Sequence, residues 1–192
     1  MHDISLGQCI RDYLTDEEVE ATTYEDMRQA LAMLLVEEKG YPKSLLRPRV
    51  AVSFPVEGKE YCRVVDLAAY SDEGRPLLMM LFCTGDVTTY VREALAAARL
   101  FPEGPTPLVA VTDSRRAVLL ETTAGALLRE DADAIPDWET LQSLAAERAT
   151  PRFSEDQLDR ERRILFAYSE SLYDCCAFAA CAAGSRGGRW KA

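Results

Sequence analysis

Asp66 is the residue whose type and position in this sequence could do chemistry. It lies in the middle of an apolar run, residues 60–70, that reads Glu-Tyr-Cys-Arg-Val-Val-Asp-Leu-Ala-Ala-Tyr. A buried, unpaired carboxylate costs several kcal/mol, so an aspartate in this place needs a metal ion, a cation or hydrogen-bond donors. Two interpretations stay open on residue type alone. Asp66 belongs to a functional site, or it is a structural aspartate neutralised by Arg63 or another nearby cation.

The elements that must position Asp66 are two extended runs joined by a turn. Residues 71–76 read Ser-Asp-Glu-Gly-Arg-Pro and separate the first run from a second, residues 77–83. Asp, Gly and Pro between two apolar runs are typical of a β-hairpin. By strand parity, Leu77, Met79, Leu81 and Cys83 should share one face of the second strand.

The rest of the chain predicts an α/β domain in the order helix, three strands, helix, two strands. Residues 1–22 suggest only a short strand or turn segment, and after Thr122 the strand pattern stops. The first helix should begin near Thr22, with Thr23 as its cap, and end at Gly40. The other expected elements are strands at 47–56, 108–112 and 117–121 and helices at 87–100 and 138–148.

A long helix is expected from Ser154 to about residue 183. Leu158, Leu165, Leu172 and Ala179 repeat in it every seven residues. Such a stripe suits packing on the parent domain, which we favour, or a two-helix dimer contact. We therefore divide the chain into an α/β domain, residues 1–130, and a helical extension, residues 131–192, with a disordered tail from about residue 184.

Composition limits the partners and the location. The net charge of −10 opposes binding to the phosphate backbone, so DNA is a possible but weak partner. A protein partner, or a second copy of the chain, could bind through the C-terminal helix. No run is long and apolar enough to span a membrane. The N-terminus has no secretory signal pattern, so we expect a cytoplasmic protein.

The chain lacks the histidines and the cysteine spacing that several kinds of catalytic or metal site require. The single histidine, His2, leaves no ordinary Ser-His-Asp or Cys-His arrangement. Cys175, Cys176 and Cys181 lack the spacing of a zinc site, and we interpret them as small apolar fillers. What remains is carboxylate and metal chemistry around Asp66, which needs two or more oxygen ligands to hold Mg²⁺.

Local strings resemble a known family. Residues 10–45 contain Tyr-Glu-Asp-Met-Arg-Gln and, further on, Glu-Glu-Lys-Gly-Tyr-Pro-Lys-Ser-Leu-Leu, and they precede the Val-Asp and Arg-Pro-Leu-Leu strands. Over residues 10–121 the chain resembles the N-terminal nuclease-like domain of type I restriction enzyme R subunits, a branch of the PD-(D/E)xK nucleases. The resemblance implies a restriction-endonuclease-like αβββαβ core, followed here by the helical extension, with a metal site on two neighbouring strands.

The resemblance also assigns roles to particular residues. It implies that Asp66 is the metal-binding aspartate and that Glu25 is a helix glutamate near the site. The expected Glu-x-Lys of the next strand falls on Leu81 and Cys83, so the second metal ligand and the charge-stabilising lysine are both missing. Glu93, on the following helix, is the carboxylate that could rebuild a two-ligand site with Asp66.

These departures lead to competing hypotheses about function. We favour a nuclease-fold protein that has lost catalysis and acts as a binding or structural module, with no cofactor. The alternative is an active Mg²⁺-dependent DNA endonuclease that uses Asp66, Glu93 and Glu25, and only this one requires magnesium. A second alternative is an oligomeric interaction protein that uses the helix at 154–183. The sequence shows no phosphate-binding loop of a motor, so we expect the protein to act alone or in trans.

Overall fold

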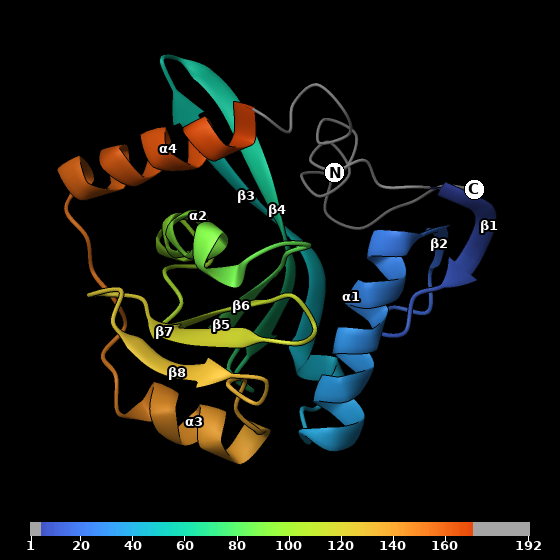
Figure 1. Ribbon diagram of the computed structural model, residues 1–192. Coiled ribbons are helices and arrows are strands. Elements are labelled where there is room, and N and C mark those ends of the chain that lie inside the picture. Colours follow the sequence, from blue (N-terminus) through green and yellow to red (C-terminus); the bar gives the residue numbers. More distant parts are fainter. Residues whose placement is uncertain (1–4, 171–192) are drawn as a thin grey trace.

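The computed structural model describes residues 5–170, which form a six-stranded mixed sheet with helices on both faces and a separate two-stranded ribbon (Figure 1). The strand order in the large sheet is β3-β4-β5-β6-β7-β8, and β1 pairs with β2. The strands are β1 (Ser5–Arg11), β2 (Glu18–Thr22), β3 (Leu46–Val56), β4 (Lys59–Tyr70), β5 (Pro76–Phe82), β6 (Leu108–Thr112), β7 (Ala117–Glu121) and β8 (Leu127–Asp131). The helices are α1 (Thr23–Met33), continued by the π-turn Leu34–Glu38, a 3₁₀ turn at Lys43–Leu45, α2 (Val87–Arg99), α3 (Trp138–Ala146) and α4 (Glu155–Glu170).

This arrangement confirms the predicted α/β class and the order α1, β3, β4, β5, α2, β6 of the expected αβββαβ core. The strands β3, β4 and β5 form the antiparallel meander, and β5 then pairs in parallel with β6. The crossover between these two parallel strands is α2, as a parallel pair requires. Every residue of β5 is buried, because helices cover both faces of the sheet there.

Two apolar clusters lie on opposite faces of the sheet. One cluster joins the sheet to α2 and α4, and the other joins it to α1 and α3. Met79, Leu81 and Cys83 lie in the cluster beneath α2, as strand parity predicts. Leu77 was expected with them but packs in the other cluster, next to the point where the register of β4 and β5 shifts.

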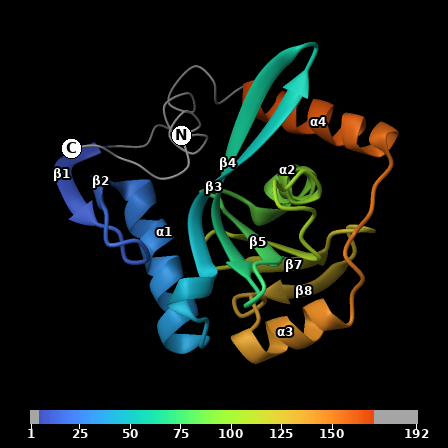
Figure 2. The same cartoon turned by 180° about the vertical axis from the view of Figure 1, so that it is seen from behind.

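The β3–β4 hairpin extends beyond the sheet and lies beside α4 (Figure 2). Its two-residue turn places Glu57 at φ 51° and Gly58 at φ 77°. Two consecutive positive φ angles define a type I′ turn, whose twist matches that of the strands. Tyr61 on this hairpin contacts Phe166 of α4, with ring centroids 4.7 Å apart. The hairpin therefore helps to hold the C-terminal helix on the domain.

The start of α1 differs by one residue from the expected cap. Thr22, and not Thr23, is the N-cap, and its hydroxyl accepts a hydrogen bond of 3.0 Å from the backbone N–H of Glu25. Thr22 has extended backbone angles, so it closes β2 and caps the helix at the same time.

Three other differences concern the two ends of the domain. The N-terminal segment forms the antiparallel ribbon of β1 and β2. A further strand, β8, pairs with β7 after Thr122, where no strand was expected. Its residues are mostly exposed and polar, so β8 lacks the apolar pattern by which strands are found in a sequence. The expected helix at 138–148 is shorter, ending at Ala146.

The C-terminal helix packs on the domain, which was the favoured of the two interpretations. Ser154 and Gln157 form a capping box, in which each side chain bonds to the backbone N–H of the other residue. Leu165 is fully buried in the cluster beneath α2. Leu172, Ala179, the three cysteines at 175, 176 and 181 and the tail lie outside the described residues. Within residues 5–170, no helix is long and apolar enough to cross a membrane. The division of the chain near residue 130 stays a prediction.

Candidate functional site where strands β4 and β5 separate

Asp66 lies where β4 and β5 cease to pair. Its carboxylate there accepts the backbone hydrogen bond that the neighbouring strand would otherwise accept. The last paired residues on this side are Leu67 of β4 and Met80 of β5. Beyond them, Oδ2 of Asp66 accepts a hydrogen bond of 2.7 Å from the backbone N–H of Phe82. Oδ1 accepts a second bond, also 2.7 Å, from the hydroxyl of Tyr24 on α1. The side chain of Asp66 thus connects β4, β5 and α1.

Burial dominates the electrostatics of Asp66. Only 6% of the residue is exposed, and this desolvation raises the pKa of its carboxyl group above the ordinary value. The hydrogen bonds from Tyr24 and Phe82 and the charge of Arg63 act in the opposite direction without cancelling the effect of burial. The same burial, together with the neighbouring carboxylate, strongly raises the pKa of the Tyr24 phenol. Tyr24 therefore stays a neutral hydrogen-bond donor.

Arg63 links Asp66 to the second candidate carboxylate, Glu93. Its Nε donates to Oε1 of Glu93 at 2.5 Å, and its Nη1 donates to the carbonyl oxygen of Val64 at 2.9 Å. The Glu93 side chain is 3% exposed, so its charge is balanced by the guanidinium and not by water. Arg63 is also attracted to Asp66 without a direct hydrogen bond. One partly buried cation thus serves both carboxylates.

Glu25 belongs to a different group of charges. On α1 it accepts hydrogen bonds from Arg28, by Nε at 2.9 Å, and from Gln29, by Nε2 at 3.0 Å. Arg28 also pairs with Asp12, and Arg49 of β3 lies 3.3 Å from Asp12 and 3.6 Å from Glu25. This buried network attaches the β1–β2 ribbon to α1 and β3, so Glu25 has a structural environment of its own.

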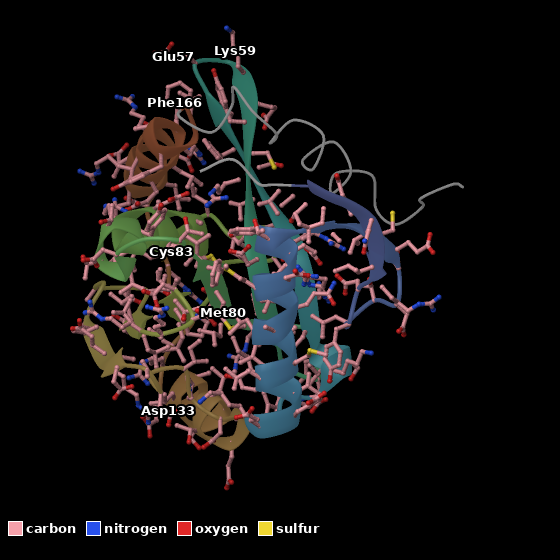
Figure 3. The ribbon with its side chains drawn as sticks, turned by 45° about the vertical axis from the view of Figure 1, so that its right-hand side comes forward. Glu57, Lys59, Met80, Cys83, Asp133 and Phe166 are labelled. Carbon is pink, nitrogen blue, oxygen red and sulfur yellow. The ribbon has the colours of Figure 1, made fainter. Side chains whose placement is uncertain are left out.

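The positions expected to carry Glu and Lys are apolar and buried. Leu81 is 1% exposed and Cys83 is 2% exposed, both within the cluster beneath α2. Figure 3 shows Cys83 in the interior of the protein, directly after the end of β5, with Met80 of that strand nearby. Burial raises the pKa of the Cys83 thiol, whose Sγ lies 3.6 Å from the carbonyl oxygen of Gly85. A neutral thiol cannot replace the positive charge of a lysine.

These donors do not fit a divalent metal ion. Both oxygens of Asp66 already accept hydrogen bonds, and Glu93 is bound to Arg63. Mg²⁺ requires several oxygen ligands in near-octahedral geometry, and the neighbouring side chains Leu81 and Cys83 offer none. Across residues 5–170, no group of three or more His, Cys, Asp or Glu side chains is placed to hold a metal ion.

Sequence reasoning identified Asp66 and Glu93 but missed their direct partners. Arg63 was considered as the neutralising cation of Asp66, yet its hydrogen bond goes to Glu93. Tyr24 was not considered, because it is 42 residues away in the sequence and lies on another element. Its position one helical turn before Arg28 on α1 gave no signal of its contact with β4.

The αβββαβ order and the position of Asp66 between β4, β5 and α1 are those of the α/β nuclease-like class of domains. Against protein families, the model described as "Type I restriction enzyme R protein N terminus (HSDR_N)" matches residues 23–136, which is more than half of the chain. The chain belongs to this family. The comparison with curated proteins gave no match, and neither did the comparison with solved structures.

Proposed function

We propose that this chain is a nuclease-fold domain without catalytic activity that serves as a binding or structural module. The ion pair of Arg63 and Glu93 carries the proposal, because the guanidinium stands where a nuclease of this class would need an exchangeable cation. Asp66 and Glu93 share that cation in a site with little exposure to water. A covalently attached guanidinium cannot be exchanged for Mg²⁺ without moving the whole side chain.

The alternative, an Mg²⁺-dependent endonuclease that uses Asp66, Glu93 and Glu25, would need two rearrangements. Arg63 would have to leave Glu93, and Glu25 would have to leave its bonds with Arg28 and Gln29. Each step exposes or orphans a charge that is now paired in the interior, at a cost of about 3–5 kcal/mol for a broken buried pair. The acidic net charge of −10 also weakens binding to DNA.

A cleavage experiment tests the proposal directly. The purified protein is incubated with supercoiled plasmid and with linear DNA in Mg²⁺ and, separately, in Mn²⁺. We expect no cleavage, and no heat of Mn²⁺ binding by calorimetry. Cleavage that disappears in Asp66→Asn would overturn the proposal, provided that circular dichroism shows the variant folded.

For the C-terminal helix we propose an intramolecular role and a monomeric protein. Leu165, one of the heptad residues, is used inside the domain and is not free for a second chain. Light scattering of the purified full chain tests this. A stable dimer would favour the other hypothesis, an interaction protein that associates through its C-terminal helix.

A further inference from the structure

A cavity of about 280 Å³ lies between α2 and α4, and none of its lining residues belongs to the group of Asp66, Arg63 and Glu93. Its size is near the lower end of small-ligand pockets, which hold roughly 300–1,000 Å³. The lining residues are Arg92, Arg99, Thr123, Phe153, Gln157, Arg160, Glu161 and Ile164. Three arginines and one glutamate give this lining a charge of +3 − 1 = +2, in a chain whose net charge is −10.

The inner wall of the cavity is fixed by two ion pairs of Glu161 and by hydrogen bonds from Arg99. Glu161 is buried and pairs with Arg99, from Nη1 at 2.7 Å, and with Arg92, whose Nη2 lies 2.6 Å away. Arg99 also donates from Nε to the carbonyl oxygen of Thr122 and from Nη2 to that of Thr123. Arg99 is therefore held in one position, and Glu161 neutralises about one of the two inner charges.

The cavity also has polar side chains that are not fully paired within the described residues. Nη1 of Arg92 and Oε2 of Glu161 are both buried and lack a hydrogen-bond partner among residues 5–170, although Oε2 lies 2.6 Å from Nη2 of Arg92 in their ion pair. Arg160 is exposed and makes no hydrogen bond or ion pair within residues 5–170. The Oε1 of Gln157 accepts from Ser154, which turns its amide group so that only the N–H donors remain. Among these groups the donors of Arg92, Arg160 and Gln157 outnumber the one acceptor, Oε2 of Glu161, and the lining has an excess positive charge, so an oxyanion is the ligand that fits.

The geometry points to a binding site for a phosphate group, which we propose is the phosphomonoester of a small molecule. Arginine forks match the oxygens of phosphate better than any other side chain does, and the excess charge of +2 matches a phosphate dianion. Phe153, whose ring lies 5.5 Å from the Arg99 guanidinium carbon, and Ile164 supply an apolar wall for the attached group. A nucleic-acid phosphate has the same chemistry, but the acidic protein repels a long polyanion.

The test measures binding of inorganic phosphate, of a nucleoside monophosphate and of a DNA oligonucleotide to the full chain by calorimetry at constant ionic strength. The variant is Arg160→Gln, and the control is Arg163→Gln. Arg163 is an exposed arginine of the same helix that pairs with Asp159 and does not line the cavity. Both substitutions remove one surface charge and should leave the fold intact, which circular dichroism checks.

We expect saturable binding of the phosphate probes, weakened about tenfold or more by Arg160→Gln and unchanged by Arg163→Gln. If DNA binds with the same dependence on Arg160, the phosphate comes from nucleic acid, and the site is still supported. Absence of saturable binding of every probe at millimolar concentration overturns the proposal. Equal weakening by both variants overturns it as well, because that result would mean general charge attraction.

Discussion

Nε of Arg63 lies 2.5 Å from Oε1 of Glu93, and the charge of the same guanidinium acts on the carboxylate of Asp66 more strongly than that of Arg28 does. A cation supplied by β4 itself thus balances two acidic residues, one on its own strand and one on α2. In this arrangement each of the two acidic residues has a cation of the protein itself acting on its charge. The predictions below follow from the position of that cation and of its partners.

Removing the cation should destabilise the protein strongly. In Arg63→Met, Glu93 and Asp66 would be buried without their balancing charge, and a broken buried pair costs about 3–5 kcal/mol. Urea denaturation measures the loss in the free energy of unfolding. The double variant Arg63→Met/Glu93→Gln should recover part of it, since one orphaned charge is gone. A single variant as stable as the wild type would contradict the ion-pair role.

The hydroxyl of Tyr24 should contribute to stability through Asp66. Tyr24→Phe leaves the buried carboxylate with the Phe82 N–H as its one direct donor, which we expect to cost about 1–3 kcal/mol. Tyr13→Phe is the matched control, because the Tyr13 hydroxyl donates to Glu37 at an exposed position. Chemical denaturation of both variants should give a large loss for Tyr24 and less than about 1 kcal/mol for Tyr13. Equal losses would show that the Asp66 contact has no special weight.

Asp66 should make stability depend on pH in a defined direction. Because its pKa is raised in the folded state, the native protein binds a proton more readily than the unfolded chain. Its contribution is fully present below the ordinary value of 3.8 and is lost as pH rises through the folded pKa. The stability of the wild type relative to Asp66→Asn should therefore fall as the pH is raised above 3.8.

The measurement is thermal unfolding of the two proteins at a series of pH values. The shifts of other groups, such as the lowered pKa values of Asp12 and Asp113, are present in both proteins and cancel in the difference. A difference that stays flat across the acidic range, or that rises with pH, would contradict the raised pKa.

Restoring the family's pattern should unfold the protein before it restores a nuclease. Leu81→Glu/Cys83→Lys places two charges in a closely packed apolar cluster beneath α2, and each buried charge costs several kcal/mol. We expect an insoluble or molten variant without cleavage of plasmid DNA in Mg²⁺. Leu81→Met is the control and should lose less than about 1.5 kcal/mol. A folded, DNA-cleaving double variant would show that the site needs only these two side chains.

Arg28 should be as important as Arg63, at the other charged group. In Arg28→Met, both Asp12 and Glu25 keep only the partly exposed Arg49 as a cation. The Asp12 side chain is 0% exposed, so it cannot be solvated instead. The expected loss of unfolding free energy is about 3–5 kcal/mol, measured by urea denaturation. Arg116→Gln removes a surface pair with Glu130 and should cost less than about 1 kcal/mol. Similar losses in both variants would contradict the structural role of the network.

The parts of the fold that the sequence predicted are those with strong apolar patterns. The run at residues 77–83 and the run at 108–112 correspond closely to β5 and β6, because buried strands between two layers of helices need continuous apolar residues. β8 was missed because an edge strand with exposed, charged residues has the composition of a loop. Its strand conformation comes from pairing with β7, which is a tertiary effect.

In the candidate site, too, the sequence revealed the residue with a local pattern but not the partners that depend on tertiary contacts. Asp66 was found because a carboxylate conflicts with its apolar surroundings. The assignment of the family's Glu-x-Lys positions to Leu81 and Cys83 came from the resemblance and stays a prediction. The partners of Asp66 could not be found in this way. Tyr24 meets it through the angle at which α1 crosses the sheet, and the Phe82 N–H is free only because β4 and β5 separate there. Neither fact has a local pattern in the sequence.

The separation of β4 and β5 at Asp66 affects how an aspartate at this position should be interpreted in related sequences. Here the carboxylate of Asp66 takes the place of a missing backbone acceptor, so it has a part in folding whether or not it binds a metal ion. An aspartate retained at this position is therefore not by itself a diagnostic marker of an active nuclease. The informative positions are its neighbours on the next strand, where a folding requirement alone favours leucine and cysteine over glutamate and lysine.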